Sequence, residues 1–324
     1  MLDFLNKVNI VDENNYYNIM TTQVEPYLAS RRREGYFYGS DGAKLHYEAY
    51  EKLISRGSVI ILHGFTESAE KFREAVYYMR KAGYSVYALD LRGHGKSYHA
   101  SEQATRIDID SFDTYADDLN IFIDSVISPK LKNGKLFIYS HSLGSTVALL
   151  YLIKYGGRVH KTVLSSPMIC GNMGMPVAVA SAVAKALCSF GGKKIPAPGR
   201  CIFDPSQTAE ESDATSKARF EYYHNKRINE PLYQTNGPSF SWVSASVAAR
   251  DKILKNAEKA AIASKLLIFK PEEDKQLLGS YTDLFAEKTH TKVKDVKDSR
   301  HEIFMSGDEV LKWYYEEILE FFAD

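Results

Sequence analysis

The chain has 324 residues, of which 44% are hydrophobic and 25% are charged, which is ordinary for a globular protein. Its 41 basic and 41 acidic side chains cancel, so no positive surplus indicates binding to nucleic acid. The longest apolar stretch, residues 176–190, is interrupted by Lys185 and is shorter than the roughly 20 residues that a membrane-spanning helix needs.

Short apolar runs alternate with helical patterns along most of the chain. Residues 36–50 alternate polar and apolar side chains around a Ser-Asp-Gly turn, which predicts an antiparallel hairpin at a sheet edge. Buried strands are predicted at 58–64, 84–90, 135–141, 161–167 and 265–271, and a short strand is predicted at 291–298. Helices are predicted at 70–81, 112–126, 147–153, 278–289 and 306–322, the last one starting from a capping box formed by Ser306 and Glu309. Apolar strands separated by helices indicate an α/β protein with a mostly parallel central sheet and helices on both faces.

The alternation of strands and helices stops after Pro167. Residues 168–249 read as helical or irregular segments with loop-like punctuation, and the alternation resumes with the strand at 265–271. About 80 residues are too many for a loop inside a compact domain. The sequence therefore predicts a core made of residues 1–167 and 250–324 and an inserted helical cap at 168–249.

The cysteines and the first residues bear on the compartment. The chain has three cysteines: Cys170, Cys188 and Cys201. An odd number argues against a disulfide framework, and their spacing, which is not that of metal ligands, argues against a zinc site. The first 20 residues contain no continuous apolar segment of the kind found in secretory signals. We expect a cytoplasmic protein that can associate peripherally with a membrane.

The segment KLFIYSHSLGST, residues 135–146, is the strongest local signal. A strand ends abruptly at Ser142 and passes into a helix, with the small residues Ser140 and Gly144 two positions away on either side. This pattern is typical of the G-x-S-x-G nucleophile elbow, which projects a strained serine above the carboxyl edge of a parallel sheet. The amides of the following helix can stabilise negative charge that develops there.

A serine nucleophile needs a base and an acid, and both occur in the order that this topology uses. His301 lies in a loop after the last predicted strand, and Asp274 follows the strand before it. We expect His301 to accept the proton of Ser142 and Asp274 to orient the imidazole ring. Three further acids stay open as alternatives to Asp274: Glu272, Glu273 and Asp298.

Two backbone amides are candidates for the oxyanion hole. One belongs to Phe65, which follows His63 and Gly64 at the end of the first buried strand, and the other belongs to Leu143, directly after the nucleophile. His63 itself is expected to form structural hydrogen bonds and is assigned no chemical role.

Five segments of the chain carry a family resemblance: HGFTES, DLRGHGKS, SHSLGS, PEED and DSRHE. Through them the chain resembles the α/β-hydrolase superfamily, and within it the monoacylglycerol lipase and bacterial lysophospholipase group of serine hydrolases. The segment GPSFSW, residues 237–242, resembles a lysophospholipase motif and suggests Trp242 as a substrate-binding residue. Ser140 and Ser145 depart from the glycines that are usual in the group. The resemblance implies an α/β-hydrolase fold with an inserted cap and no metal or organic cofactor.

The resulting prediction is a serine esterase that cleaves a single-chain lipid ester, a lysophospholipid or a monoacylglycerol, through an acyl-enzyme intermediate. The small-molecule substrate would enter beneath the cap, whose apolar segment 176–190 suits an acyl chain or a transient contact with a membrane surface. The alternatives are a short-chain carboxylesterase and a non-catalytic protein of the same fold.

Overall fold

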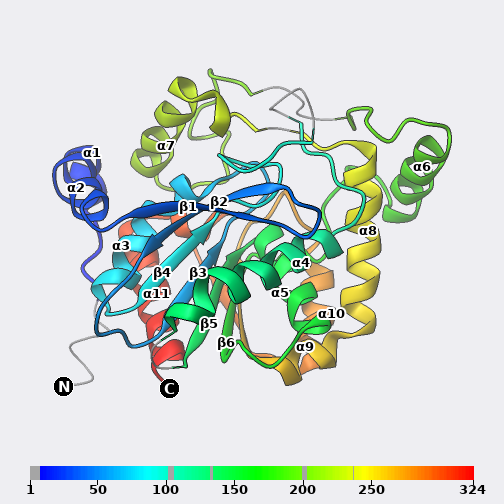
Figure 1. Ribbon diagram of the computed structural model, residues 1–324. Helices are drawn as coiled ribbons and strands as arrows, with labels where there is room; N and C mark the ends of the chain where they lie inside the picture. Colours follow the sequence, from blue (N-terminus) through cyan, green and yellow to red (C-terminus); the bar gives the residue numbers. More distant parts are fainter. Residues whose placement is uncertain (1–7, 101–105, 132–133, 199–202, 236) are drawn as a thin grey trace.

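In the part of the chain that the structure describes, a mixed sheet of eight strands forms the centre, with helices on both of its faces (Figure 1). The computed structural model describes residues 8–100, 106–131, 134–198, 203–235 and 237–324. The strand order is β1-β2-β4-β3-β5-β6-β7-β8. Strands β1 and β2 form the antiparallel hairpin at one edge, β2 is antiparallel to β4, and every other pair is parallel. The predicted edge hairpin and the mostly parallel sheet are therefore confirmed.

The strands and helices have the following bounds. The strands are β1 (Arg33–Tyr38), β2 (Lys44–Tyr50), β3 (Ser58–Leu62), β4 (Ser85–Leu89), β5 (Leu136–His141), β6 (Lys161–Ser165), β7 (Lys265–Pro271) and β8 (Val293–Val296). The core helices are α3 (Arg73–Lys81), α4 (Asp113–Phe122), α5 (Leu143–Lys154), α9 (Ala257–Ala263), α10 (Gly279–Thr289) and α11 (Asp308–Ala323), and the 3-10 turn η3 (Ala69–Phe72) precedes α3.

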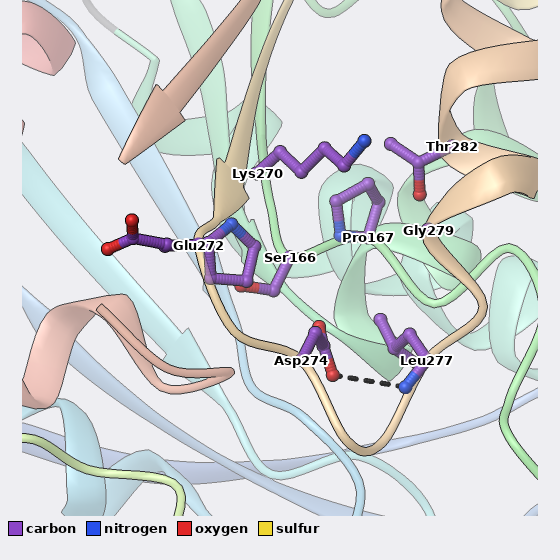
Figure 2. A pocket seen from close by; sticks show the side chains of 9 residues that line it. Ser166, Pro167, Lys270, Glu272, Asp274, Leu277, Gly279 and Thr282 are labelled. Atoms are coloured by element: carbon purple, nitrogen blue, oxygen red, sulfur yellow. Dashed lines mark hydrogen bonds between the residues drawn. The ribbon is translucent and has the colours of Figure 1, made fainter. Parts of the chain in front are cut away.

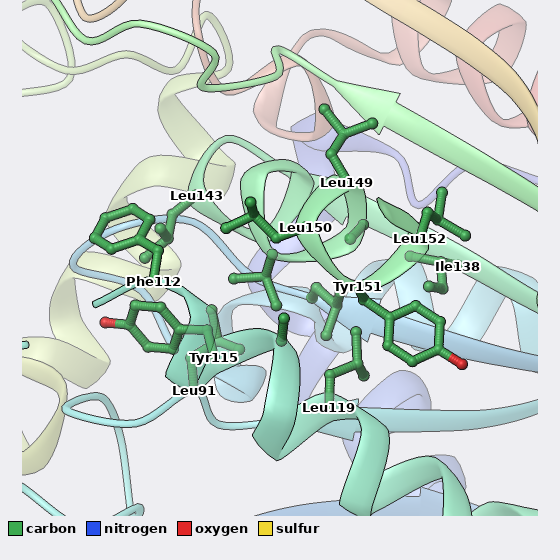
Figure 3. Close-up of a cluster of buried hydrophobic side chains, with 14 of the residues drawn as sticks. Leu91, Phe112, Tyr115, Leu119, Ile138, Leu143, Leu149, Leu150, Tyr151 and Leu152 are labelled. Atoms are coloured by element: carbon green, nitrogen blue, oxygen red, sulfur yellow. The ribbon is translucent and has the colours of Figure 1, made fainter. Parts of the chain in front are cut away.

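Alternate residues of each central strand enter two separate hydrophobic clusters. In β3, Ile60 and Leu62 pack with α4, α5, α9 and α10, whereas Val59 and Ile61 pack with α3 and α11 on the opposite face. Figure 3 shows the part of the first cluster that lies between α4 and α5. Every residue of β3 and β5 is buried, because both faces of the sheet are covered. This explains why these strands are continuous apolar runs in the sequence.

The N-terminal residues add helical turns that the sequence analysis did not predict. The segment from η1 (Glu13–Asn15) through α1 (Tyr16–Ile19) and η2 (Met20–Val24) to α2 (Glu25–Ala29) packs against the face that carries α3. The predicted capping box of the last helix is wrong. Helix α11 has Gly307 as its N-cap and no capping side chain, and the Asp308 carboxylate accepts a hydrogen bond from the Glu13 amide instead.

The segment between β6 and β7 contains α6 (Val177–Ser189), α7 (Lys217–Asn229), η6 (Pro231–Tyr233) and α8 (Phe240–Lys255) before α9. Helices α6 and α7 lie apart from each other at the top of Figure 1, and α8 runs from that region down along the core. Helix α8 therefore crosses the predicted boundary between residues 249 and 250 without interruption.

Helix α7 is fixed to the core by a buried cation. The Arg219 guanidinium is fully buried and pairs with Glu74 of α3 at 3.0 Å and with Asp308 of α11 at 2.9 Å. Its Nη2 also donates a hydrogen bond to the Val11 carbonyl at 2.8 Å. Arg219 thus joins the segment between β6 and β7, the helices α3 and α11, and the N-terminal segment at one point.

Candidate active site

Ser142 stands at the turn between β5 and α5 in a strained backbone conformation. Its φ of 49° and ψ of −114° lie in a region that non-glycine residues rarely adopt. The surrounding backbone holds the turn, because the Ser142 amide donates to the Ser165 carbonyl and the Ser142 carbonyl accepts from the Met168 amide. The elbow geometry thus arises from β5, β6 and the first turn of α5 together.

The two serines that depart from the expected glycines form hydrogen bonds with each other. Ser140 Oγ lies 3.0 Å from Ser145 Oγ and donates to the Val163 carbonyl at 2.7 Å. Both side chains are fully buried, and the Ser140 hydroxyl has its hydrogen-bonding capacity satisfied. Gly144, in contrast, cannot be replaced by a residue with a side chain without a shift of the backbone, because a Cβ at this position would lie 2.2 Å from the Leu62 carbonyl oxygen. Glycine is therefore required at only one of the two small positions that flank Ser142.

The three side chains proposed from the sequence come together in one hydrogen-bonded series. His301 Nε2 lies 3.0 Å from Ser142 Oγ, and His301 Nδ1 lies 2.8 Å from Asp274 Oδ2. Asp274 follows β7 and His301 follows β8, so the carboxyl ends of neighbouring parallel strands deliver both residues to Ser142. The arrangement can move a proton from the serine oxygen to the imidazole ring.

The Asp274 carboxylate is also fixed by its own loop. Its Oδ1 accepts hydrogen bonds from the amides of Gln276 and Leu277, the second of which is drawn in Figure 2. Of the alternative acids, Glu272 accepts a hydrogen bond from the Asp298 amide, and no hydrogen bond or ion pair in the described part of the chain joins Glu272, Glu273 or Asp298 to His301. Asp274 is therefore the acid that contacts the ring.

The surroundings of His301 favour its charged form. Burial lowers the pKa of the imidazole, but the hydrogen bond and the negative charge of Asp274 outweigh burial and raise the pKa above its ordinary value. An imidazolium that forms during proton transfer is stabilised in this way.

His63 and Phe65 follow β3, and the other predicted site residues, Leu143 and Trp242, lie in α5 and α8. The His63 ring contacts the Gly64 carbonyl through Nδ1 and accepts from the Leu91 amide through Nε2, as expected of a structural histidine. Phe65 lies two residues after His63, and the centroid of the Phe65 ring lies 4.5 Å from that of the Trp242 ring. Trp242 is in the first turn of α8 and is largely buried against Phe65 and Phe112. Leu143 is the first residue of α5.

Sequence reasoning missed a serine that positions the histidine loop. Ser166 follows β6 with a φ of 43° and donates from its Oγ to the His301 carbonyl at 2.7 Å. It also lines a cavity of about 190 Å³ beside Asp274 (Figure 2). A serine after a strand is common in any α/β protein, so no local signal could have singled it out.

One group of side chains in the described residues is close enough to hold a metal ion. Ligand atoms of Glu34, His46 and Glu48 lie within 4.8 Å of one another. Cations of the protein already occupy both carboxylates, since Arg73 binds Glu48 through two nitrogens and Lys96 lies 3.2 Å from Glu34. The group lies on the β1–β2 hairpin and contacts none of the three residues of the series. Cys170 and Cys188 are free, and Cys201 lies outside the described residues.

Comparison with known proteins agrees with the fold. A family model described as serine aminopeptidase, S33, matches residues 54–308. Lysophospholipase L2 of Escherichia coli strain K12 is 25% identical over 305 residues, which cover 90% of this chain and 88% of that protein. The monoacylglycerol lipase of Mycolicibacterium smegmatis is 30% identical over 162 residues, which cover 49% of this chain and 55% of that protein.

Solved structures share the architecture. A soluble variant of the monoglyceride lipase from Saccharomyces cerevisiae superposes with a TM-score of 0.69 at 20% identity, covering 89% of this chain and 94% of that chain. The monoacylglycerol lipase of Paleococcus ferrophilus gives a TM-score of 0.67 at 21% identity, covering 86% and 98%. At these identities the likeness establishes the fold. Since the family model spans most of the chain and the sheet has the matching architecture, the chain belongs to the serine aminopeptidase S33 family and is a serine hydrolase with the α/β-hydrolase fold.

Proposed function

We propose that the protein hydrolyses single-chain lipid esters, lysophospholipids or monoacylglycerols, with Ser142, His301 and Asp274 as its catalytic residues. The observation that carries the proposal is the continuous series of hydrogen bonds from Asp274 through His301 to Ser142, at 2.8 and 3.0 Å. The relatives named lysophospholipase L2 and monoacylglycerol lipase support the substrate class.

The mechanism follows from the atoms that face each other. His301 Nε2 takes the proton as Ser142 Oγ attacks the ester carbonyl, and Asp274 keeps the Nδ1 proton directed away from the serine. The protonated ring then gives its proton to the leaving alcohol, which leaves an acyl group on Ser142. Water, deprotonated by the same ring, releases the fatty acid. The amides of Phe65 and Leu143 are the proposed donors to the oxyanion in both steps.

The substrate is proposed to lie beneath the insertion, which we regard as a cap at residues 168–249. Trp242 and Phe65 place two aromatic rings in contact where the cap meets the oxyanion loop. An acyl chain favours apolar surroundings of this kind, and each buried methylene contributes about 0.8 kcal/mol. Trp242 is therefore the proposed substrate-binding residue of the cap.

Helix α6 is proposed to contact the lipid surface from which the substrate is taken. Only Ala180 and Ala184 of this helix are buried, whereas Val179 and Val183 are about half exposed and Phe190 at its end is 91% exposed. Lys185, Lys193 and Lys194 lie exposed around these apolar side chains. Apolar groups flanked by lysines suit a surface of anionic lipids. No helix of the described residues is long and apolar enough to cross a bilayer. The exposed apolar side chains of α6 support a transient, peripheral contact, and we propose a cytoplasmic location for the protein.

Ester hydrolysis by purified protein tests the proposal. We expect a burst of p-nitrophenol from long-chain p-nitrophenyl esters, turnover of lysophospholipid or monoacylglycerol, and covalent labelling by a fluorophosphonate. Ser142→Ala should abolish all three, and retained turnover in that variant would refute the assignment. A steep preference for acetyl or butyryl esters would favour a short-chain carboxylesterase instead. A folded protein that neither hydrolyses nor labels would indicate a non-catalytic member of the fold.

A further inference from the structure

A buried lysine joins the two loops that flank the catalytic series. Lys71 of η3 donates from its Nζ to Glu67 Oε1 at 2.9 Å and to Glu302 Oε1 at 2.5 Å. The Lys71 and Glu67 side chains are almost completely buried, and that of Glu302 is 17% exposed. Three charges at this depth are costly to desolvate, and a buried ion pair is weak evidence of a contribution to stability. Their position in the fold indicates another role.

Glu67 connects the lysine to the loop that carries Phe65. Glu67 Oε2 accepts a hydrogen bond from the Gly64 amide at 2.6 Å, so the carboxylate holds the His63–Gly64 peptide, one peptide before the amide of Phe65. The space is tight, because a Cβ on Gly64 would lie 2.8 Å from Glu67 Oε2 and 2.9 Å from the His141 ring. A shift of Glu67 would therefore move the amide proposed for the oxyanion hole.

Glu302 connects the lysine to the loop that carries His301. It is the next residue after His301, and its own amide donates to the Asp213 carbonyl at 3.1 Å. Ser166 holds the other side of the same peptide through the His301 carbonyl. Within the described part of the chain, Lys71 is the only residue that forms a hydrogen bond or ion pair with the Glu302 side chain.

The charges of the group support a fixed geometry. Burial raises the pKa of Glu67, but Lys71, His141 and the hydrogen bonds from Lys71 and Gly64 outweigh burial and lower the pKa to about 2. Burial raises the pKa of Glu302 above its ordinary value, although the Lys71 charge opposes this. Burial lowers the pKa of the neighbouring His141 to about 3, so this ring is neutral. Lys71 is the cation that contacts both carboxyl groups.

We propose that Lys71 is a positioning residue that holds the loop of Phe65 and the loop of His301 at the separation that catalysis requires. The inference rests on the proposed function, because it assigns the two loops their roles in ester hydrolysis. Lys71 contacts neither Ser142 nor the ring of His301 in any hydrogen bond or ion pair of the described residues, so it acts through Glu67 and Glu302.

The chain offers a matched control. Lys226 of α7 also bridges two carboxylates, Glu25 at 2.5 Å and Glu70 at 2.6 Å, but it joins the cap to the N-terminal segment and η3 and touches neither loop. Lys71→Met and Lys226→Met therefore remove the same kind of charged bridge at two places. Only Lys71→Met should lower kcat by more than its loss of stability explains.

The experiment measures kcat, KM, the rate of fluorophosphonate labelling and the melting temperature of each variant. Lys71→Met should lower kcat and the labelling rate by about 10- to 100-fold with KM within about threefold, the loss expected when an oxyanion donor and a base are misplaced. Lys71→Arg, which keeps the charge, should restore most of kcat. Lys226→Met should keep kcat within about twofold. If Lys71→Met does not fold, Glu302→Gln, which keeps the shape of the side chain, should show the same direction of change.

A pH profile separates positioning from simple destabilisation. Without Lys71, Glu67 and Glu302 repel each other, and Asp213, Tyr223, His301 and the neutral His141 are the titratable groups that interact with them. Both carboxyl groups should then ionise as the pH rises, without a cation to compensate them. Activity of Lys71→Met should therefore fall at alkaline pH, and the double variant Lys71→Met/Glu302→Gln should lack that fall. Wild-type kcat in Lys71→Met, or equal losses in Lys71→Met and Lys226→Met, would overturn the inference. Failure of the proposed function itself would appear separately, as retained turnover in Ser142→Ala.

Discussion

Replacing Gly144 by alanine tests whether the elbow depends on close contact between two backbones. Gly144 is the second residue of α5, and a Cβ at this position would lie 2.2 Å from the Leu62 carbonyl oxygen and 2.8 Å from that of His63. Both contacts are to the backbone at the end of β3, so no side-chain rotation can relieve them. Either β3 or the first turn of α5 must move.

The magnitude follows from two opposing effects. Overpacking against a buried strand costs about 3 kcal/mol at the upper end of its usual range. Alanine in place of glycine in a helix raises the free energy of unfolding by about 1 kcal/mol. The expected net loss is about 2 kcal/mol of the free energy of unfolding. Since the Ser142 hydroxyl and the Leu143 amide belong to the same turn, a displacement near 1 Å should also lower kcat by about 100-fold.

Urea unfolding and ester turnover measure the two effects. The matched control is Gly171→Ala, because a Cβ on Gly171 has no neighbour within 4 Å and the residue has no positive φ. We expect this control to stay within about 0.5 kcal/mol of wild type and to keep full activity. A Gly144→Ala protein with wild-type unfolding midpoint and wild-type kcat would refute the argument from backbone contact.

Two further predictions concern pH and the lipid surface. Neutral His301 accepts the proton, and Asp274 raises the pKa of its ring. The value of kcat/KM should therefore fall as the pH drops through a value above the ordinary histidine pKa of about 6.5. Asp274→Asn should move this acidic limb of the pH profile to lower pH, and a wild-type limb below about 6.5 would contradict the effect of Asp274. Binding to anionic phospholipid vesicles, measured by cosedimentation, should weaken as the salt concentration rises. Phe190→Asp should lower the affinity for the vesicles about tenfold. The control Ile262→Asp, at a similarly exposed apolar residue of α9, should bind as wild type does. Equal binding by the two variants would speak against α6 as the contact.

Much of the core could be predicted from the sequence because its signals are local. Strands that are buried on both faces must be continuous apolar runs, and β3 and β5 are recognisable for that reason. The elbow is visible because a strained serine between a strand and a helix needs small neighbours. The order of Ser142, Asp274 and His301 follows from the order of the strands in a parallel sheet.

Other features depended on contacts between residues far apart in the chain. The sequence contained four acids near the required place, and only the fold brought Asp274 to the ring. The capping box is absent because α11 has its N-cap at Gly307, one residue later than predicted, and no side chain caps it. Asp308 in its first turn binds the Glu13 amide and Arg219, residues that no local pattern could bring near α11. The N-terminal helical turns escaped prediction for the same reason, since they are stabilised by packing on a distant helix.

The amino-acid sequence alone determined the strands, the nucleophile elbow and the chain order of the three side chains, because apolar periodicity and turn chemistry act over a few residues. Only the tertiary structure decided which carboxylate meets the histidine, and which lysine joins the two loops around it. Side chains such as Lys71, Glu67 and Glu302 carry no pattern of their own, and their effect exists only where the folded chain excludes water from them.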